Sequence, residues 1–238
     1  MNLDNHLNII FDEIKISSDL KLIDIWKNIN LQTKSNYDLN SSIAFKRLIR
    51  SFFLFKYFKS VSNLSGNILE VGVFKGFSAL LLKQLEDKIN VNKKKECLFL
   101  IDSFEGLSKI NKEDKVSNKE IYQHQEGHFK VNFEDVQNLF KNDDNVKLLK
   151  GWIPKIFDLL DNKNLYKFVH IDVDLFEPTL DTLNYVFDKV VKGGVIITDD
   201  FGSIAFPGNR KAWQKFFIEK NIQNSIALPS GQAVYIKE

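Results

Sequence analysis

One stretch, residues 166–201, contains two apolar runs that each end in a pair of acids. The first run leads to Asp172 and Asp174. The second follows a helix-period segment and a Lys-Gly-Gly turn, and it leads to Asp199 and Asp200. Apolar runs of this kind are typical of parallel strands buried on both faces. Two such strands joined by a helix form a βαβ unit, so both point the same way. We therefore expect the four acids at the carboxyl ends of neighbouring strands, where open α/β sheets bind ligands.

Four carboxylates at one edge repel one another unless a cation lies among them. A hard divalent cation is the simplest such partner, because carboxylate oxygens are its preferred ligands. Acids also end strands, or cap the next helix, without any ligand. That alternative stays open for any single aspartate, whereas a pair at each of two strand ends favours a cation site.

Composition limits the class of protein. The 238 residues fit one α/β domain with an extension, and a net charge of +2 gives no reason to expect nucleic acid or an anionic membrane as partner. No apolar run approaches the roughly 20 residues that span a bilayer, and the N-terminus lacks the pattern of a signal peptide. The single cysteine, Cys97, cannot form a disulfide framework. A cytoplasmic protein is the resulting expectation.

A strand, a glycine loop and a helix start follow one another between residues 67 and 85. The spacing Gly72-x-x-x-Gly76 lacks the middle glycine of a dinucleotide fingerprint, since Phe74 stands in its place. The loop therefore suits a ligand without phosphates, and Glu70 suits a cation. S-adenosylmethionine meets both conditions. Glycines also serve such joints for backbone reasons alone, so the spacing by itself does not decide the ligand.

Asp102 ends the next predicted strand, Cys97–Ile101, and an acid there can accept both hydroxyls of a ribose. An N-cap for the following segment is an equally good interpretation. Phe104 could form a wall for an adenine ring, and Trp152 is either a ligand-stacking ring or a core residue. The polar stretch 108–128 predicts an active-site loop or a mobile flap, and its two histidines are interpreted as solvated.

The N-terminal residues 1–66 are predicted to be helical, with a broad apolar stripe from Ile43 to Phe58. Arg47 and Arg50 interrupt this stripe. We interpret them as a solvated face with buried stems, in preference to a ligand contact. The predicted division is an N-terminal helical extension or lid over 1–66 and a main domain over 67–238.

The C-terminal end predicts how the sheet closes. Apolar runs at 225–228 and 232–237 flank a Pro-Ser-Gly turn and read as an antiparallel hairpin. With a third strand at 146–149, the chain predicts an α/β fold: a mostly parallel seven-stranded sheet with helices on both faces.

Taken together, these motifs resemble the macrocin O-methyltransferase (TylF-like) family of class I S-adenosylmethionine-dependent methyltransferases. The resemblance covers roughly residues 67–217. It implies a Rossmann-like fold and methyl transfer from S-adenosylmethionine to a hydroxyl of a sugar or glycoside. The segments that carry it are LEVGVFKG (69–76), DSFEGL (102–107), KGW (150–152), HIDVDLF (170–176) and the run from Gly193-Gly194 to Asp199-Asp200-Phe201.

The resemblance also implies roles for particular residues. Members of the family hold Mg²⁺ with the acid that ends strand four and the acid pair that ends strand five, which implies Asp172, Asp199 and Asp200 here. Leu175 stands where catechol-type methyltransferases have a lysine base, so Asp172 or Asp174 is expected to accept the proton. The implied cofactor residues are Glu70 toward the methionine ammonium, Asp102 toward the ribose, and Gly72, Val73, Phe74, Gly76, Ser78, Ser103, Phe104, Gly151, Trp152 and Asp172.

Three alternatives stay open. The acceptor could be a phenol or catechol, because the acceptor pocket lies outside the resemblance. A nicotinamide-dependent oxidoreductase is disfavoured by Phe74, and a non-catalytic binding module is disfavoured by the intact carboxylate set. A small-molecule acceptor is the expected partner, and a homodimer is possible.

Overall fold

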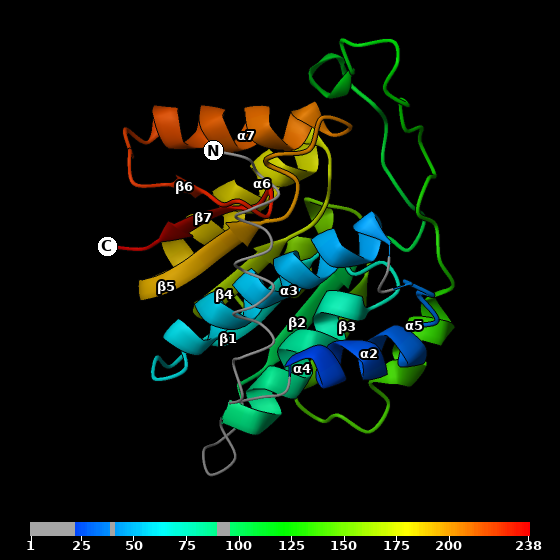
Figure 1. Ribbon diagram of the computed structural model, residues 1–238. Coiled ribbons are helices and arrows are strands. Elements are labelled where there is room, and N and C mark those ends of the chain that lie inside the picture. The colour runs from blue at the N-terminus through cyan, green and yellow to red at the C-terminus, as the bar shows by residue number, and fades with distance from the viewer. Residues whose placement is uncertain (1–21, 39–40, 90–95) are drawn as a thin grey trace.

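The computed structural model describes residues 22–38, 41–89 and 96–238, whose strands form one seven-stranded sheet (Figure 1). The strand order is β3-β2-β1-β4-β5-β7-β6. Strands β1 to β5 are parallel, and β7 is antiparallel to both β5 and β6. The predicted parallel sheet with a C-terminal hairpin is therefore confirmed. The strands are β1 (Asn67–Val71), β2 (Leu98–Asp102), β3 (Val146–Lys150), β4 (Tyr166–Ile171), β5 (Val190–Thr198), β6 (Ile226–Ala227) and β7 (Ala233–Ile236).

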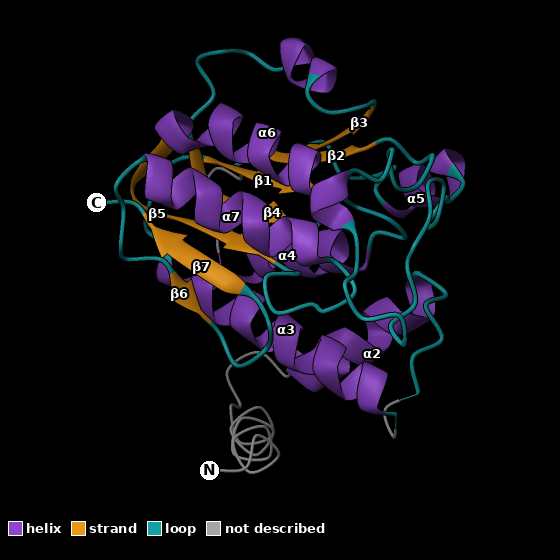
Figure 2. Ribbon diagram, turned by 90° about the horizontal axis from the view of Figure 1, so that it is seen from above, coloured by secondary structure: helices purple, strands orange, loops and turns teal. Residues whose placement is uncertain are grey.

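Helices cover both faces of this sheet (Figure 2). Successive strand side chains point to opposite faces, so each central strand supplies two separate cores. Helices α2, α3 and α4 pack on the face that presents Ile68 and Ile197, and α6 and α7 pack on the face that presents Leu69 and Ile196. No helix within the described residues is long and apolar enough to span a membrane. The α-helices are α2 (Leu22–Gln32), α3 (Ser42–Ser60), α4 (Phe77–Ile89), α5 (Phe133–Leu139), α6 (Phe176–Val186) and α7 (Pro207–Glu219), and short 3-10 turns are η1 (Lys112–Asp114), η2 (Lys155–Leu159) and η3 (Phe187–Lys189).

The strand order reverses between β1 and β4, which makes their carboxyl ends the expected ligand site of the sheet. The two ends approach each other closely at Gly72. Its φ is +90°, and a Cβ at this position would lie 1.9 Å from the carbonyl oxygen of Asp172. Only glycine therefore lets the chain leave β1 beside the end of β4.

The predicted helical extension is found in α2 and α3, while residues 1–21 and 39–40 lie outside the described part. Helix α3 begins after Ser41, whose hydroxyl accepts a hydrogen bond from the backbone N–H of Ala44. The extension shares one apolar core with the sheet. Trp26 of α2 is fully buried and contacts the rings of Tyr37 and Phe77, with centroids 6.0 and 5.3 Å away.

The turn predicted at Lys192-Gly193-Gly194 does not separate a helix from a strand. These residues lie inside β5, which begins earlier, at Val190. Tyr166 of β4 pairs with Val190, but Phe168 pairs with Val195, so β5 contains extra residues and bulges there. Gly193, with a φ of +77°, supplies the backbone conformation of the bulge.

Replacing the buried indole should show how much the extension contributes to folding. Trp26→Ala is expected to lower the free energy of unfolding by about 3–5 kcal/mol, because it leaves a large cavity between α2 and α4. Leu31→Ala, on the same helix but 79% exposed, is the matched control and should change it little. Urea unfolding measures both, and equal effects of the two substitutions would contradict the packing described here.

Candidate active site at the carboxyl edge of the sheet

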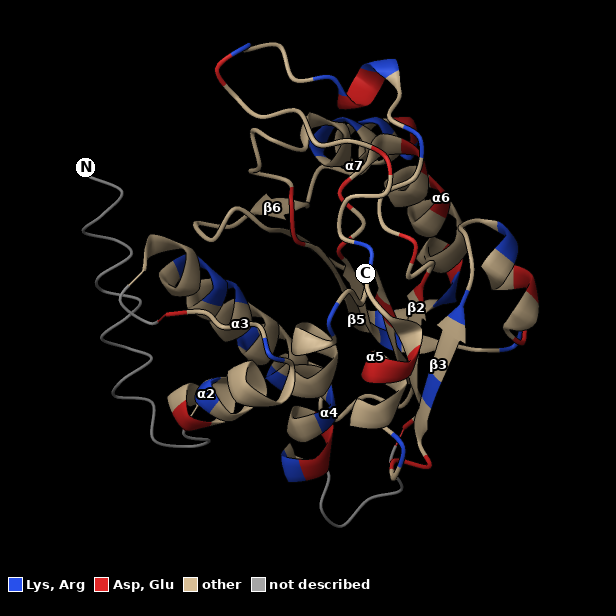
Figure 3. Cartoon of the chain, turned by 90° about the vertical axis from the view of Figure 1, so that its right-hand side faces the viewer, with Lys and Arg blue, Asp and Glu red and all other residues tan. Residues whose placement is uncertain are grey.

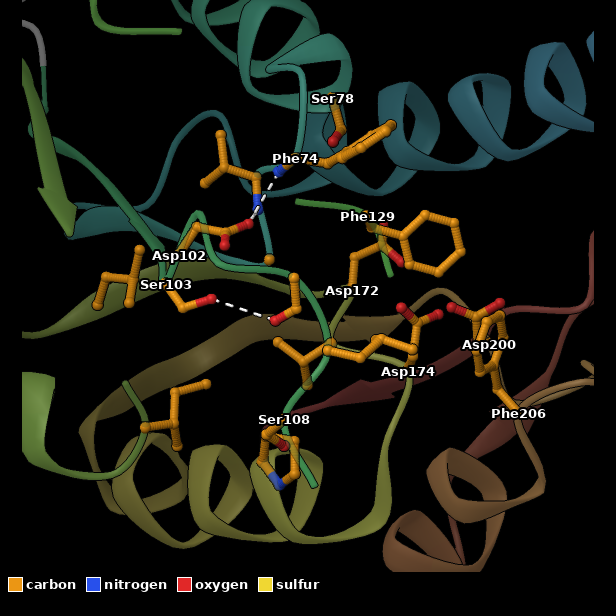
Figure 4. A pocket seen from close by; sticks show the side chains of 18 of the residues that line it. Phe74, Ser78, Asp102, Ser103, Ser108, Phe129, Asp172, Asp174, Asp200 and Phe206 are labelled. Carbon is orange, nitrogen blue, oxygen red and sulfur yellow. Dashed lines mark hydrogen bonds between the residues drawn. The ribbon is translucent and has the colours of Figure 1, made fainter. Parts of the chain in front are cut away.

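A cavity of about 340 Å³ lies at the carboxyl ends of β1 and β4 (Figure 4). Its walls come from the loops that follow β1, β2, β3, β4 and β5 and from one side of α3. Figure 3, which looks onto this edge, shows basic residues along α3 and acidic residues on the loops around the strand ends. The predicted cofactor residues that line the cavity are Gly72, Val73, Phe74, Ser78, Asp102, Ser103, Gly151, Trp152 and Asp172.

Three other predicted cofactor residues, Glu70, Gly76 and Phe104, do not line the cavity. Phe104 is 1% exposed and packs in the core against Phe133, with ring centroids 5.1 Å apart, so its interpretation as a wall for adenine is not supported. Gly76 faces the side chain of Leu139. Glu70 is fully buried and binds His170, and its Oε2 has no hydrogen-bond partner among the described residues. A direct contact between Glu70 and the cofactor remains a prediction that this arrangement does not favour.

Asp102 uses its carboxylate to hold two loops in place. The backbone N–H groups of Val73 and Phe74 donate to Oδ2 at 2.7 and 2.9 Å, and the N–H of Phe104 donates to Oδ1 at 2.7 Å. Phe74 and Phe104 have positive φ values of 49° and 58°, which non-glycine residues rarely adopt. The carboxylate therefore stabilises both loops, and this agrees more closely with the capping interpretation than with a free acceptor for ribose.

Trp152 lies in the cavity wall with 45% of its surface exposed. The alternative that its ring belongs to the core is therefore wrong. An indole in this position, beside Gly151 and near Asp102, can stack on a flat ligand.

Three carboxylates converge at one end of the cavity. Asp172, Asp174 and Asp200 each bring one oxygen within 4.8 Å of the others, and Figure 4 shows Asp174 and Asp200 pointing toward one another. Burial, followed by the charges of Asp199 and Asp200, raises the pKa of Asp172 well above its ordinary value. Burial and the charges of Asp200 and Asp172 do the same to the pKa of Asp174. Both groups would ionise more easily beside additional positive charge.

Asp199 takes a different place from the one expected for a metal ligand. It does not line the cavity, and both of its oxygens are occupied. Oδ2 accepts from Nη1 of Arg50 at 2.8 Å, and Oδ1 accepts from Nε2 of Gln232 at 2.7 Å. Burial alone would raise the pKa of Asp199, but the guanidinium of Arg50 and the hydrogen bond from His170 hold it below its ordinary value.

The structure thus groups Asp174, rather than Asp199, with Asp172 and Asp200. Adjacent residues at a strand end point to opposite sides, which separates Asp199 from Asp200. His170, Asp172 and Asp199 form a second group within the same distance, but there His170 and Asp199 already bind each other. The expected metal set of Asp172, Asp199 and Asp200 does not come together as one group here, and it stays a prediction.

Arg47 and Arg50 do not form a solvated face, and that interpretation is wrong. Both line the cavity. Arg50 bridges the acid pair, with Nη1 2.8 Å from Asp199 and Nη2 3.3 Å from Asp200. The guanidinium of Arg47 lies 5.8 Å from the ring centre of Tyr37, and it also interacts with the charge of Asp172. The apolar pattern of α3 indicated where the helix packs, but no local signal showed that its two arginines meet acids about 150 residues away.

Asp174 is held in a strained backbone conformation. Its φ is +60°, and the N–H of Leu175 donates to the carbonyl of Val173 at 2.5 Å across it. This is a γ-turn of the rare type, which costs free energy and occurs where the surrounding structure enforces it. The turn sends Asp174 into the cavity, immediately before α6 begins at Phe176.

The polar stretch 108–128 is tied down at both ends beside the cavity. Near its start, the carboxylate of Asp114 accepts a hydrogen bond from the backbone N–H of Phe176 at 2.7 Å. Its two ends are joined to each other, because the N–H of Leu107 donates to the carbonyl of His128 at 2.8 Å. His124 stacks on Phe206, a residue of the cavity wall, with centroids 4.7 Å apart, so it is not simply solvated. The stretch therefore lies beside the cavity, and its roles as an active-site loop or a mobile flap both remain predictions.

Residues 58–238 match the model of a protein family described as macrocin-O-methyltransferase (TylF). The chain belongs to this family. It is 27% identical over 145 residues to demethyldecarbamoylnovobiocin O-methyltransferase of Streptomyces niveus, an alignment that covers 59% of this chain and 54% of the relative. It is 26% identical over 141 residues to a tetracenomycin-C 4′-O-methyltransferase of Streptomyces olivaceus, and this alignment covers 57% of this chain and 53% of the relative. The full name of that relative specifies a dimethoxy-α-L-rhamnosyl group. The chain thus spans about half the length of these two relatives.

The fold is shared with solved methyltransferases. The crystal structure of the calicheamicin methyltransferase CalS11 superposes with a TM-score of 0.67 and 17% identity, covering 90% of this chain and 91% of that one. The expected Rossmann-like class I methyltransferase fold and the expected family are both confirmed. Membership in a family of O-methyltransferases also leaves the alternative of a nicotinamide oxidoreductase without support.

Removing the Asp102 carboxylate should loosen both loops that it holds. Asp102→Ala is expected to lower the free energy of unfolding by about 2–4 kcal/mol, because hydrogen bonds to charged groups each contribute about 1.5–3 kcal/mol. Asp102→Asn keeps one acceptor oxygen, so its free energy of unfolding should fall by less than that of Asp102→Ala. Asp144→Ala, an exposed acid elsewhere, is the control. Chemical denaturation measures all three, and an Asp102→Ala protein as stable as the control would contradict the capping role.

Proposed function

We propose that this protein transfers the methyl group of S-adenosylmethionine to a hydroxyl group of a sugar or glycoside, assisted by a divalent cation, with Mg²⁺ the first candidate. The observation that carries the proposal is the convergence of Asp172, Asp174 and Asp200 on one end of the cavity at the carboxyl edge of the sheet. Family membership supports the reaction type. The rhamnosyl group in the name of one relative supports a sugar acceptor over a phenol or catechol.

The residues of the cavity divide into two groups that suit two ligands. Gly72 and Gly151 both bond through their backbone N–H to the end of β2, and with the indole of Trp152 and the loops held by Asp102 they suit an adenosine. In Figure 4, Asp174, Asp200 and Phe206 lie on the other side of the cavity from Asp102 and Ser103. Aromatic faces next to acids suit a sugar ring, because its C–H side can pack on a ring while its hydroxyls donate to carboxylates.

The donor chemistry fits a divalent cation. Carboxylate oxygens are hard ligands of the kind that Mg²⁺ prefers. Asp172, Asp174, Asp199 and Asp200 carry four negative charges when ionised, and Arg47 and Arg50 supply two positive ones. These six residues therefore carry an excess of negative charge, which a divalent cation would reduce. Asp172, Asp174 and Asp200 would hold it, and when bound it would make an acceptor hydroxyl easier to deprotonate.

The protein's own residues would then align and deprotonate the acceptor. Asp174, fixed by its γ-turn, takes the hydroxyl proton while the acceptor oxygen forms its bond to the methyl carbon and the carbon–sulfur bond breaks. Each carboxylate has two oxygens, so one can serve the cation and the other the proton. Phe129 and Phe206 limit how the acceptor can sit, and no covalent link to the enzyme is required.

The cofactor can be tested without knowing the acceptor. S-adenosylmethionine and S-adenosylhomocysteine should raise the melting temperature, because a ligand at 100 times its Kd stabilises the folded state by about 2.7 kcal/mol. NAD should not, since Phe74 occupies the place where a pyrophosphate-binding loop needs glycine. Thermal shift measurements decide this, and equal stabilisation by NAD would refute the cofactor assignment.

The reaction itself is tested by transfer of labelled methyl groups to a panel of nucleotide sugars, glycosides and catechols, with and without a chelator. We expect transfer to a sugar hydroxyl that stops in chelator and returns with Mg²⁺. Asp200→Asn should reduce the rate at least about 100-fold, with S-adenosylmethionine affinity nearly unchanged, because its carboxylate lies away from the adenosine end. Asp188→Asn, an exposed acid, serves as control. Full activity of Asp200→Asn in the presence of chelator would mean that the three carboxylates have a structural role only.

A further inference from the structure

A buried row of charged and polar side chains runs beneath the cavity, from β1 through β4 to β5. Nδ1 of His170 lies 2.8 Å from Oε1 of Glu70, and Nε2 of the same ring lies 3.3 Å from Oδ1 of Asp199. Glu70 and His170 are paired positions on neighbouring strands, which places both on the sheet face covered by α3 and α4. All three side chains are almost completely buried.

The row continues outward into the residues of the cavity. Asp199 binds Arg50, and the second nitrogen of Arg50 contacts Oδ1 of Asp200 at 3.3 Å. Gln232, which immediately precedes β7, donates to the same oxygen of Asp199 that faces His170. Asp199 is thus fixed from three sides, and the row reaches the cavity at Arg50 and Asp200, which both line it.

We propose that His170 is a positioning residue: anchored on Glu70, it fixes Asp199, which in turn fixes Arg50 and through it the carboxylate of Asp200. The role rests on the proposed function, because Asp200 belongs to the carboxylate group assigned to the cation. Residues that orient ligating carboxylates typically contribute 10- to 100-fold to metal affinity or activity. A histidine suits this place because its two ring nitrogens lie on opposite sides and can bind two carboxylates at once.

A purely structural role for the same contacts is the competing explanation. Breaking a buried ionic contact destabilises a protein whether or not it orients a functional group. Strand β4 offers a matched control, since Lys167 forms a buried ion pair with Glu86 at 3.3 Å, three residues before His170 and away from the cavity. Lys167→Met should therefore reproduce the loss of stability without the loss of positioning.

Two substitutions of His170 separate its two contacts. The amide nitrogen of a glutamine reaches about as far as Nε2, so His170→Gln keeps a donor toward Asp199. The shorter His170→Asn keeps only the side toward Glu70. With the full chain and Mn²⁺ as probe, we expect His170→Asn to raise the Mn²⁺ Kd about 10- to 100-fold. The Mn²⁺ Kd values of His170→Gln and Lys167→Met should stay within about threefold of the Kd of the unsubstituted protein. Equal Kd values for all four proteins, or equal losses for both His170 variants, would overturn the positioning role.

A second measurement does not depend on the cation. Hydrogen exchange of the α3 backbone around Arg50 should speed up in His170→Asn and not in Lys167→Met, because only the former releases the anchor of Arg50. If the unsubstituted protein binds no Mn²⁺, the cation site fails, and the exchange result then decides the positioning role on its own. Unchanged exchange around Arg50 in His170→Asn would refute it.

Discussion

The crowding of like charges at the ends of β4 and β5 is the constraint on which the rest of this structure depends. Four aspartates come together within a largely buried region, where unbalanced charge is far more costly than in water. Two arginines of α3 neutralise part of that charge. His170 of β4 contacts Asp199 from within the sheet. Burial and the neighbouring acids raise the pKa values of Asp172 and Asp174 well above their ordinary value.

The N-terminal helices consequently serve more than one purpose. They bury Trp26 against helix α4, and α3 brings Arg47 to the wall of the cavity and Arg50 to the acid pair. Tyr37, in the connection between α2 and α3, lines the cavity as well. Docking of the extension and neutralisation of the acids are therefore one event. The loop 108–128 approaches from the other side, where Asp114 fastens it to the start of α6 just beyond Asp174.

Much of the fold could be predicted from the sequence, because apolar runs indicate strands that are buried on both faces and glycines indicate tight turns. The acids at the ends of β4 and β5 followed from the βαβ pattern of 166–201. Pairings between side chains distant in sequence did not follow. Which of Asp199 and Asp200 faces the cavity depends on where β5 stops, and the partners of Arg50 depend on how α3 docks. The glycine pair at 193–194 predicts a turn but forms a bulge inside β5, because such a pair is compatible with both.

One consequence concerns how such enzymes can be remodelled. Helix α3, which lines one side of the cavity, also carries Arg50, the cation that bridges Asp199 and Asp200. One wall of the cavity and part of its charge balance thus depend on the same nineteen-residue helix, α3. Grafting the N-terminal helices of one family member onto another to change its acceptor would transplant a counter-ion as well. A chimera with a neutral residue in place of Arg50 would inherit a new pocket together with an unbalanced pair of acids.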